Sequence, residues 1–226
     1  MITRKAKLLI ALMFAGMLQT LTAHSQVLAD VFGNPVKPNS YVEVEGSPYY
    51  FKEGWHPAVI TLSDKSVIKD VDLKFDIVED KLYFKAQNGE TMSFTKPVRE
   101  FTFNVGKDVT SPAHFKNGYN GIPDFSFDAY FEVLAEGKAQ LLKKVFKKVA
   151  ENKMYGSATI TKTFVENVRY YIVTSTATIQ IKNDKKSVLL ALPDKKDLLE
   201  AYIKENNLNL KKDTDLTKLI TYYNSI

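Results

Sequence analysis

Few residues of this chain have the type and spacing that catalysis or metal binding requires. The chain contains no cysteine, so thiolate nucleophiles, thiolate metal ligands and disulfides are excluded. His56 and His114 are far apart in the sequence and lack a ligand-spaced partner, so they predict no zinc site. Asp213 and Asp215 lack the other oxygen ligands of a calcium loop, and we interpret them as helix-capping residues. The sequence thus indicates no metal ion and no cofactor.

Carboxylates offer the next possible chemistry, because paired acids can cleave glycosidic bonds. Asp70, Asp72 and Asp76 would lie on one face of a strand, but they alternate with apolar residues. That alternation favours a solvent-exposed outer face over an acid/base pair. The sequence also lacks a G-x-S-x-G elbow, a G-x-G-x-x-G fingerprint and a P-loop. We therefore predict no catalytic residue.

Two groups of side chains could instead form binding surfaces. The first is a lysine cluster that could dock on anionic lipid headgroups or an acidic partner, with a solvated helix face as the simpler alternative: Lys143, Lys144, Lys147 and Lys148. The second is a group of aromatic residues that includes Phe115 and Tyr119. If these rings line a pocket, they suit an apolar or sugar-like ligand; alternating aromatic residues otherwise form a core.

The first 25 residues have the features of a secretory signal peptide. Three basic residues precede the apolar run 8–18, and small residues lead to a predicted cleavage between Ser25 and Gln26. The remaining 201 residues would carry a net charge of only +2, which argues against a nucleic-acid partner. No later stretch is long and apolar enough to span a bilayer. We expect an exported protein, periplasmic or secreted, whose partner is an envelope protein, a lipid or a glycan.

Most of the chain shows the alternation of apolar and polar residues that is typical of strands. The clearest strand is 70–77, and the Asn88-Gly89 pair predicts a hairpin turn within a meander over 70–105. Punctuation by glycine, proline and asparagine predicts a long loop over 106–122, with a short strand around Phe115. Further strands are expected over 41–45, 58–62, 125–133, 168–174 and 177–182.

The segment 138–150 is ambiguous. The Glu136-Gly137 turn favours a returning strand over 138–144, whereas the apolar spacing from Leu142 to Val149 also fits a helix, so 145–150 stays open. The end of the chain has helical periodicity. We predict one helix starting near Asp194, with a stripe that includes Leu199, and a second starting at Asp213 or Thr214.

Several short segments together resemble a family of uncharacterised exported proteins of Bacteroidota. They are 46–50, 71–77, 82–85, 131–138 with 141–143, and 219–225. The resemblance implies a strand–turn–strand around 136–138. It carries no activity and no catalytic residue.

These observations predict a mainly β protein, an antiparallel meander forming an open barrel or curled sheet, with two C-terminal α-helices packed on it. The expected division is a signal peptide over 1–25, a β domain over 26–192 and a helical pair over 193–226. The leading functional hypothesis is a non-enzymatic binding or scaffolding protein of the bacterial envelope. The alternatives are a carrier of an apolar ligand in a barrel interior, and a hydrolase of envelope polymers that uses unidentified carboxylates.

Overall fold

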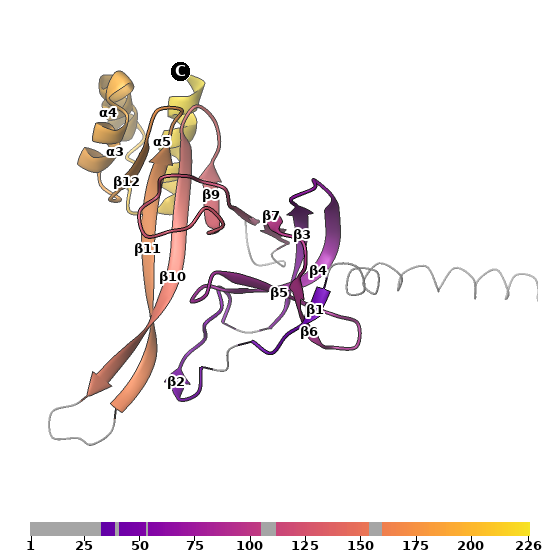
Figure 1. The fold of residues 1–226 in the computed structure, drawn as a ribbon. Coiled ribbons are helices and arrows are strands. Elements are labelled where there is room, and N and C mark those ends of the chain that lie inside the picture. Colours follow the sequence, from indigo (N-terminus) through magenta and orange to yellow (C-terminus); the bar gives the residue numbers. More distant parts are fainter. Residues whose placement is uncertain (1–32, 39–40, 53, 105–111, 154–159) are drawn as a thin grey trace, which may run out of the picture.

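The computed structural model describes residues 33–38, 41–52, 54–104, 112–153 and 160–226 (Figure 1). The expected signal peptide, with its cleavage point between Ser25 and Gln26, lies outside the described residues. The described chain is mainly β and forms one large mixed sheet that does not close, which confirms the predicted fold class. Three α-helices accompany the sheet within these described ranges.

Six strands between residues 56 and 116 form the N-terminal part of the sheet, which we call the meander. In space, the first of these six strands lies in the middle, with the second strand on one side and the fifth on the other. The meander predicted over 70–105 is confirmed for its first three strands, which pair in sequence order, but the strand Val98–Phe103 pairs with His56–Leu62 and not with the strand before it. Gly89 has a φ of 86° and donates its N–H to the carbonyl of Ala86, which closes the turn that Asn88-Gly89 predicted. The strands are β3 (His56–Leu62), β4 (Val67–Asp76), β5 (Lys81–Lys85), β6 (Thr91–Phe94), β7 (Val98–Phe103) and β8 (Ala113–Lys116), and β1 (Gly33–Pro35) pairs with β6.

Aromatic side chains fill the interior of the meander. Alternation along β4, β7 and β8 sends Phe75, Phe101 and Phe115 to one side, where each is at most 2% exposed. The rings of Phe101 and Phe115 stack with centroids 4.8 Å apart, and the Tyr50 ring meets Phe115 edge-on at 5.0 Å. Such ring pairs contribute about 0.5–1.5 kcal/mol each beyond the area that they bury. This packing takes the place of disulfides.

The strand that follows the meander is shorter than predicted. We expected a strand over 125–133, but β9 (Phe131–Ala135) starts only at Phe131. Before it, the chain makes two turns, in which the N–H of Phe125 donates to Ile122 and the N–H of Ala129 to Ser126. The alternating rings of this segment reflect packing on β9, since Phe125 meets Phe131 edge-on at 5.7 Å.

The ambiguous segment 138–150 is a strand from Gln140 onward, including 145–150. β10 (Gln140–Lys153) pairs antiparallel with β11 (Ile160–Val173) over all 14 residues of each strand, without a register shift. The start of β10 is buried on both faces, because Leu141 and Leu142 are both fully buried. That double burial is why its sequence lacks the simple alternation of an exposed strand.

β11 has two further neighbours along its other edge. β12 (Thr178–Ile181) pairs antiparallel with its end, and β2 (Val44–Glu45) pairs parallel with Lys162 and Thr163. β2 is shorter than the predicted strand over 41–45, because Tyr41 and Glu43 have φ angles of 43° and 62°. Positive φ interrupts an extended backbone. The strand order is β1-β6-β5-β4-β3-β7-β8-β9-β10-β11-β12, and β2 lies off this path beside β11.

The helices pack at one end of the β10–β11 pair (Figure 1). The two predicted helices are present as α4 (Lys196–Glu205), preceded by a 3₁₀ turn over Pro193–Lys195, and α5 (Asp213–Ser225). A third helix, α3 (Lys185–Ala191), was not predicted; the Asp184 carboxylate caps it by accepting from the N–H of Ser187. None of the described helices is long and apolar enough to cross a bilayer.

Side chains of the helices bury one face of the sheet. Leu216, Leu219 and Ile220 of α5 are fully buried in one cluster with Leu141 and Ile172. Asn224 fixes the end of α5, because its carboxamide accepts from the N–H of Ala139 and donates to the carbonyls of Glu136 and Ala139. A Cβ at Gly137 would lie 2.5 Å from the Asn224 carboxamide, so this turn requires glycine.

Candidate functional site

The β10–β11 hairpin is the one long element that changes character along its length. We call residues 140–144 and 169–173 its proximal half, and residues 145–153 and 160–168 its distal arm; the two strands stay in register through both. Fourteen residues of strand span about 45 Å, which is longer than most strands in globular domains. In Figure 1 the helices cover the proximal half, and the distal arm extends away from them beyond the meander.

The proximal half is covered on both faces. Leu141 and Ile172 pack under the helices, whereas Leu142 and Tyr171 pack on the other face against Phe131. All of these side chains are fully buried. Burial on both faces gives this half a structural role.

A buried ion pair joins the proximal half to the meander. Lys144 Nζ lies 2.7 Å from Asp80 Oδ2 and donates to the carbonyl of Tyr130 at 2.8 Å. The Lys144 side chain is 3% exposed, and its ammonium lies 5.4 Å from the ring centroids of Phe125 and Phe131. Burial lowers the pKa of Lys144 and raises that of Asp80, although each partner opposes the shift of the other. This environment makes Lys144 an anchor of the fold.

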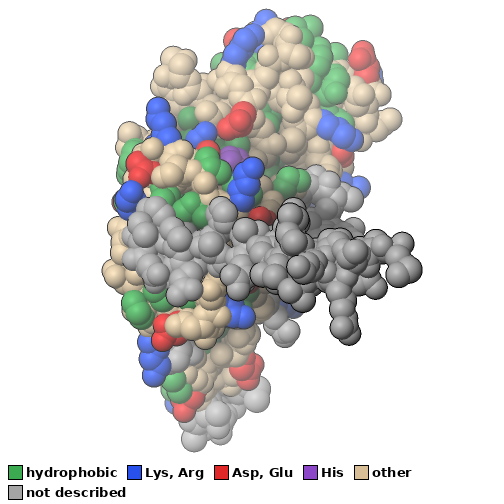
Figure 2. Space-filling model, turned by 90° about the vertical axis from the view of Figure 1, so that its right-hand side faces the viewer, with side chains coloured by type: hydrophobic (Ala, Val, Ile, Leu, Met, Phe, Trp, Pro, Cys, Tyr) green, Lys and Arg blue, Asp and Glu red, His purple; other side chains and the backbone are tan. Residues whose placement is uncertain are grey.

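The predicted lysine cluster is therefore divided between the two faces of one strand. Lys143 bonds Asp213 at 2.7 Å and lies 3.5 Å from Glu132; burial alone would lower its pKa, but these two acids raise it above its usual range. Lys147 donates to the carbonyls of Ser47 and Tyr49, and only Lys148 has an exposed side chain. The four lysines thus form no common surface. On the face that Figure 2 shows, basic and acidic side chains are interspersed.

The two aromatic residues that we singled out also lie in packed surroundings. Phe115 is part of the aromatic core of the meander and is 2% exposed. Tyr119 packs edge-on against Phe131 at 5.6 Å, and its hydroxyl donates to Gln140 Oε1. The structure does not bring Phe115 and Tyr119 together at a pocket.

The remaining titratable candidates have structural contacts. Asp213 does not cap α5; its carboxylate accepts from Lys143 and from the Tyr170 hydroxyl, which corrects our prediction. Asp215 accepts from the N–H of Asn209. His114 Nδ1 lies 2.8 Å from the Thr102 hydroxyl. In the part of the chain that the structure describes, no three histidine or acidic side chains gather as a metal site.

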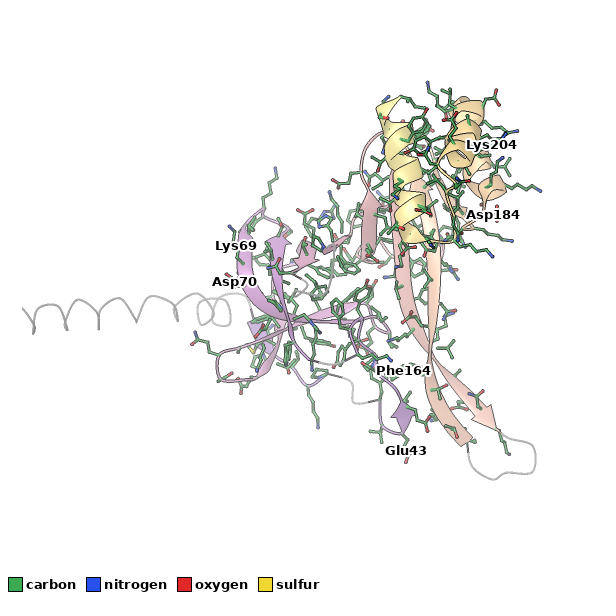
Figure 3. The ribbon with its side chains drawn as sticks, turned by 180° about the vertical axis from the view of Figure 1, so that it is seen from behind. Glu43, Lys69, Asp70, Phe164, Asp184 and Lys204 are labelled. Atoms are coloured by element: carbon green, nitrogen blue, oxygen red, sulfur yellow. The ribbon has the colours of Figure 1, made fainter. Side chains whose placement is uncertain are left out.

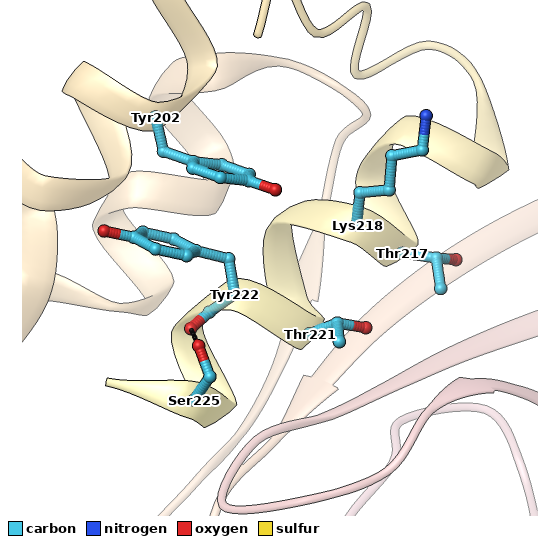
Figure 4. A pocket seen from close by; sticks show the side chains of 6 residues that line it. All are labelled: Tyr202, Thr217, Lys218, Thr221, Tyr222 and Ser225. Carbon is cyan, nitrogen blue, oxygen red and sulfur yellow. Dashed lines mark hydrogen bonds between the residues drawn. The ribbon is translucent and has the colours of Figure 1, made fainter. Parts of the chain in front are cut away.

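Two hollows on the surface of the described residues offer little enclosed space. The larger, of about 350 Å³, is an open depression between α4 and α5 beside the stacked rings of Tyr202 and Tyr222 (Figure 4). Its rim carries Thr217, Thr221 and Lys218. The second hollow, between Tyr49 and Phe103, has no room for a water molecule. Neither of these two hollows is lined by Asp or Glu, so they offer a hydrolase no carboxylate pair.

The distal arm, by contrast, exposes large apolar side chains. Nine large hydrophobic side chains among the described residues are strongly exposed, and four of them are on this arm. Their exposed fractions are 41% for Val149, 51% for Ile160, 45% for Val165 and 43% for Val168. Tyr41 partly covers one face of the arm, with its ring 5.2 Å from that of Phe164. Figure 3 shows Phe164 well down the hairpin, away from Asp184 and Lys204, which belong to the helical end.

The arm also leaves backbone edges without a neighbouring strand. Beyond Lys143, the described residues supply no strand that pairs with the outer edge of β10; only the N–H of Lys147 reaches the carbonyl of Ile77. On β11, no described strand pairs with residues 164–169, between β2 and β12. Unpaired edges with exposed β-branched side chains are a place where another chain can add.

Sequence reasoning missed this arm. Its signal was present in residues 160–168, where neither face is purely apolar: Lys162 and Glu166 share one face with branched and aromatic residues, and the other face mixes Val165 with threonine and asparagine. Such a mixture indicates a strand that is covered on neither face. The chain matches no family model, and neither a curated protein nor a solved structure is significantly similar to it.

Proposed function

We propose that this protein is a non-enzymatic binding or scaffolding protein of the bacterial envelope, and that its distal arm engages a polypeptide partner. The observation that carries the proposal is the arm itself, a paired ribbon that extends past the packed body and exposes four β-branched side chains. The signal-like first 25 residues support an exported location, periplasmic or secreted.

An isolated two-stranded ribbon is marginally stable in water, because neither strand buries enough apolar surface. In this protein the proximal half holds the ribbon in register, so that the distal arm stays extended. A partner that covers the exposed valine and isoleucine side chains removes their apolar surface from water. This burial stabilises the complex by about 25 cal/mol per Å² of apolar surface. The arm is therefore built as a docking element.

Charged side chains on the arm have a second explanation, since lysines on edge strands discourage aggregation. Lys148 and Lys153 on β10 fit that role. The exposed centre of β11, from Val165 to Val168, contains only one charged residue, Glu166. Protection of one edge and exposure of the other favour a specific partner over general repulsion.

The packed aromatic interior supports a scaffold over a carrier. Phe75, Phe101 and Phe115 contact one another across the meander, and the hollow beside Phe103 admits no water. An apolar ligand would have to displace these rings. For a binding protein, such a core serves to hold the arm in place.

Photo-cross-linking from the arm tests the proposal. p-Benzoylphenylalanine replaces Val165, 45% exposed on the arm, or Val67, 56% exposed on the meander, in the full chain expressed in cells that encode it. Irradiation should produce a discrete cross-linked polypeptide from position 165 and none from position 67. The absence of a cross-linked product at position 165, or the same product from both positions, would contradict the proposal.

A further inference from the structure

Among the described residues, the outer edge of β11 has a neighbouring strand on either side of an interval in which no strand pairs with it. At one end β12 pairs with Tyr170 to Val173, and at the other β2 pairs with Lys162 and Thr163. The interval between them, residues 164–169, measures about 20 Å at the usual rise of a strand. Both flanking strands are held by main-chain pairing, so the interval continues an edge that this protein already uses for strand addition.

The peptide groups in this interval point toward the open side. In an antiparallel pair, successive residues direct their N–H and C=O groups alternately to the partner strand and away from it. The N–H of Lys147 bonds Ile77 and not β11, so Lys147 and its partner Glu166 both point outward. The N–H of Thr174 bonds the carbonyl of Ala177 in the turn to β12 and so also points away from β10. Counting back from Thr174 therefore gives the same result, that the even-numbered residues of β11 direct their backbone groups outward. Glu166 and Val168 therefore present their backbone groups to the interval.

Resting on the proposed function, we infer that the partner contributes an extended segment of about six residues that adds to β11 as a β-strand between β2 and β12. Main-chain hydrogen bonds to Glu166 and Val168 hold the segment, as in other complexes formed by strand addition. The added strand makes the edge of β11 continuous from Lys162 to Val173.

Side chains on β11 specify the chemistry of that segment. Glu166 and Val168 share one face, and Glu166 is 54% exposed although it lies 3.8 Å from Lys147 on β10. A basic residue opposite Glu166, adding to that contact, and a branched apolar residue opposite Val168 are therefore favoured. On the other face, Val165 favours a second branched residue. The occupant is thus an alternating, β-rich segment with one lysine or arginine near its centre.

A second copy of this chain is a poorer occupant. Antiparallel pairing of two β11 strands about Glu166 would place two carboxylates opposite each other, and like charges in that position are destabilising. The outer edge of β10 is also a poorer site, because Ile77 already occupies the N–H of Lys147 and lysines flank the remainder. The interval on β11 has neither obstacle.

The test uses a phage-displayed library of random ten-residue peptides, from which binders to residues 26–226 of the protein are selected. Binding of the best selected peptide is measured by fluorescence anisotropy to the wild-type protein and to two variants, Val168→Pro and Val149→Pro. Both valines are exposed and both direct their N–H outward, so proline removes no bond of the β10–β11 pair. Only Val168 lies in the interval.

We expect the peptide to bind the wild type and Val149→Pro equally, and Val168→Pro about tenfold more weakly. A peptide N-methylated at the alternate amides that face β11 should also bind the wild type about tenfold more weakly, a result that needs no folded variant. Thermal unfolding of both variants checks their fold.

Equal binding to both proline variants, or full binding by the N-methylated peptide, would overturn strand addition. A dimer in analytical ultracentrifugation that Val168→Pro dissociates would identify a second copy as the occupant and would also overturn it. If the partner cross-linked at position 165 is retained by Val168→Pro, strand addition fails while the proposed function stands. If no partner is cross-linked at all, the proposed function fails.

Discussion

The two halves of the β10–β11 hairpin share one pairing and differ in almost everything else. In the proximal half, Leu142 and Tyr171 are fully buried, because packed side chains cover both faces. In the distal arm, Val149 and Val165 keep more than 40% of their surface in solvent. Neighbouring elements, and not the strands themselves, thus divide one hairpin into a structural half and an exposed half.

This division explains how a long ribbon can remain extended. Strand pairing alone gives a marginal hairpin, whereas the helices and the Phe131 group fix the proximal half, and register passes along the paired backbones. Substitutions that act on only one half of the hairpin test this explanation.

The largest effect is expected at the ion pair that joins the proximal half to the meander. Asp80→Ala leaves the Lys144 ammonium buried without a counter-charge, and should lower the free energy of unfolding by about 3–5 kcal/mol. Urea unfolding followed by circular dichroism measures the loss.

The double variant Asp80→Asn with Lys144→Met is the control. It removes both charges and should regain most of that stability, to within about 1–2 kcal/mol of the wild type. If Asp80→Ala alone unfolds at the wild-type urea concentration, the anchor assigned to Lys144 is wrong.

A matched pair of side-chain substitutions compares the two halves directly. Leu142→Ala creates a cavity in the proximal half and should cost about 2–5 kcal/mol. Val165→Thr, in the distal arm, keeps the branched shape on an exposed strand and should change stability by no more than about 0.5 kcal/mol. Equal losses at the two positions would show that the distal arm is packed as firmly as the proximal half.

A smaller effect is expected from Tyr119, whose hydroxyl bonds Gln140 at the start of β10. Burial, assisted by Glu136, raises the pKa of Tyr119 from 10.0 to about 12. The folded state therefore holds the proton more tightly, and this contribution is fully present below about pH 10 and is lost as the pH rises through about 12. Tyr119→Phe should lose less stability than the wild type between about pH 10 and 12, as measured by urea unfolding. An identical pH dependence in both proteins would be the contrary result.

Much of the fold could be predicted from the sequence, where one face of a strand is buried and the other is wet. The alternation at Val71, Leu73 and Phe75 gives β4 for that reason. The predicted wet face is wrong at Asp76, which is fully buried and accepts from the N–H groups of Val78 and Glu79. The same rule failed ahead of β9, because Phe125 packs its ring from a turn and alternation does not distinguish the two. It left 145–150 undecided because the lysines there serve opposite faces of one strand.

The candidate site was harder to predict, since it depends on distant partners. The sequence places Lys144 in a cluster of lysines, but in the structure its ammonium is buried against Asp80 and the carbonyl of Tyr130, which are distant in the sequence. The exposure of the distal arm depends on the strands that pair with β10 and β11 elsewhere along their edges, and the spacing of residues within the arm does not encode that pairing. The short helix α3 has a clear cap at Asp184, but seven residues are too few for a periodic signal.

Hydrogen–deuterium exchange on residues 26–226, without a partner, is the most direct test of the difference between the proximal half and the distal arm. The backbone amides of the proximal half should exchange through near-global unfolding, and those of the distal arm should exchange faster while remaining paired. Uniform, strong protection along all of β10 and β11 would contradict an exposed arm that waits for a partner.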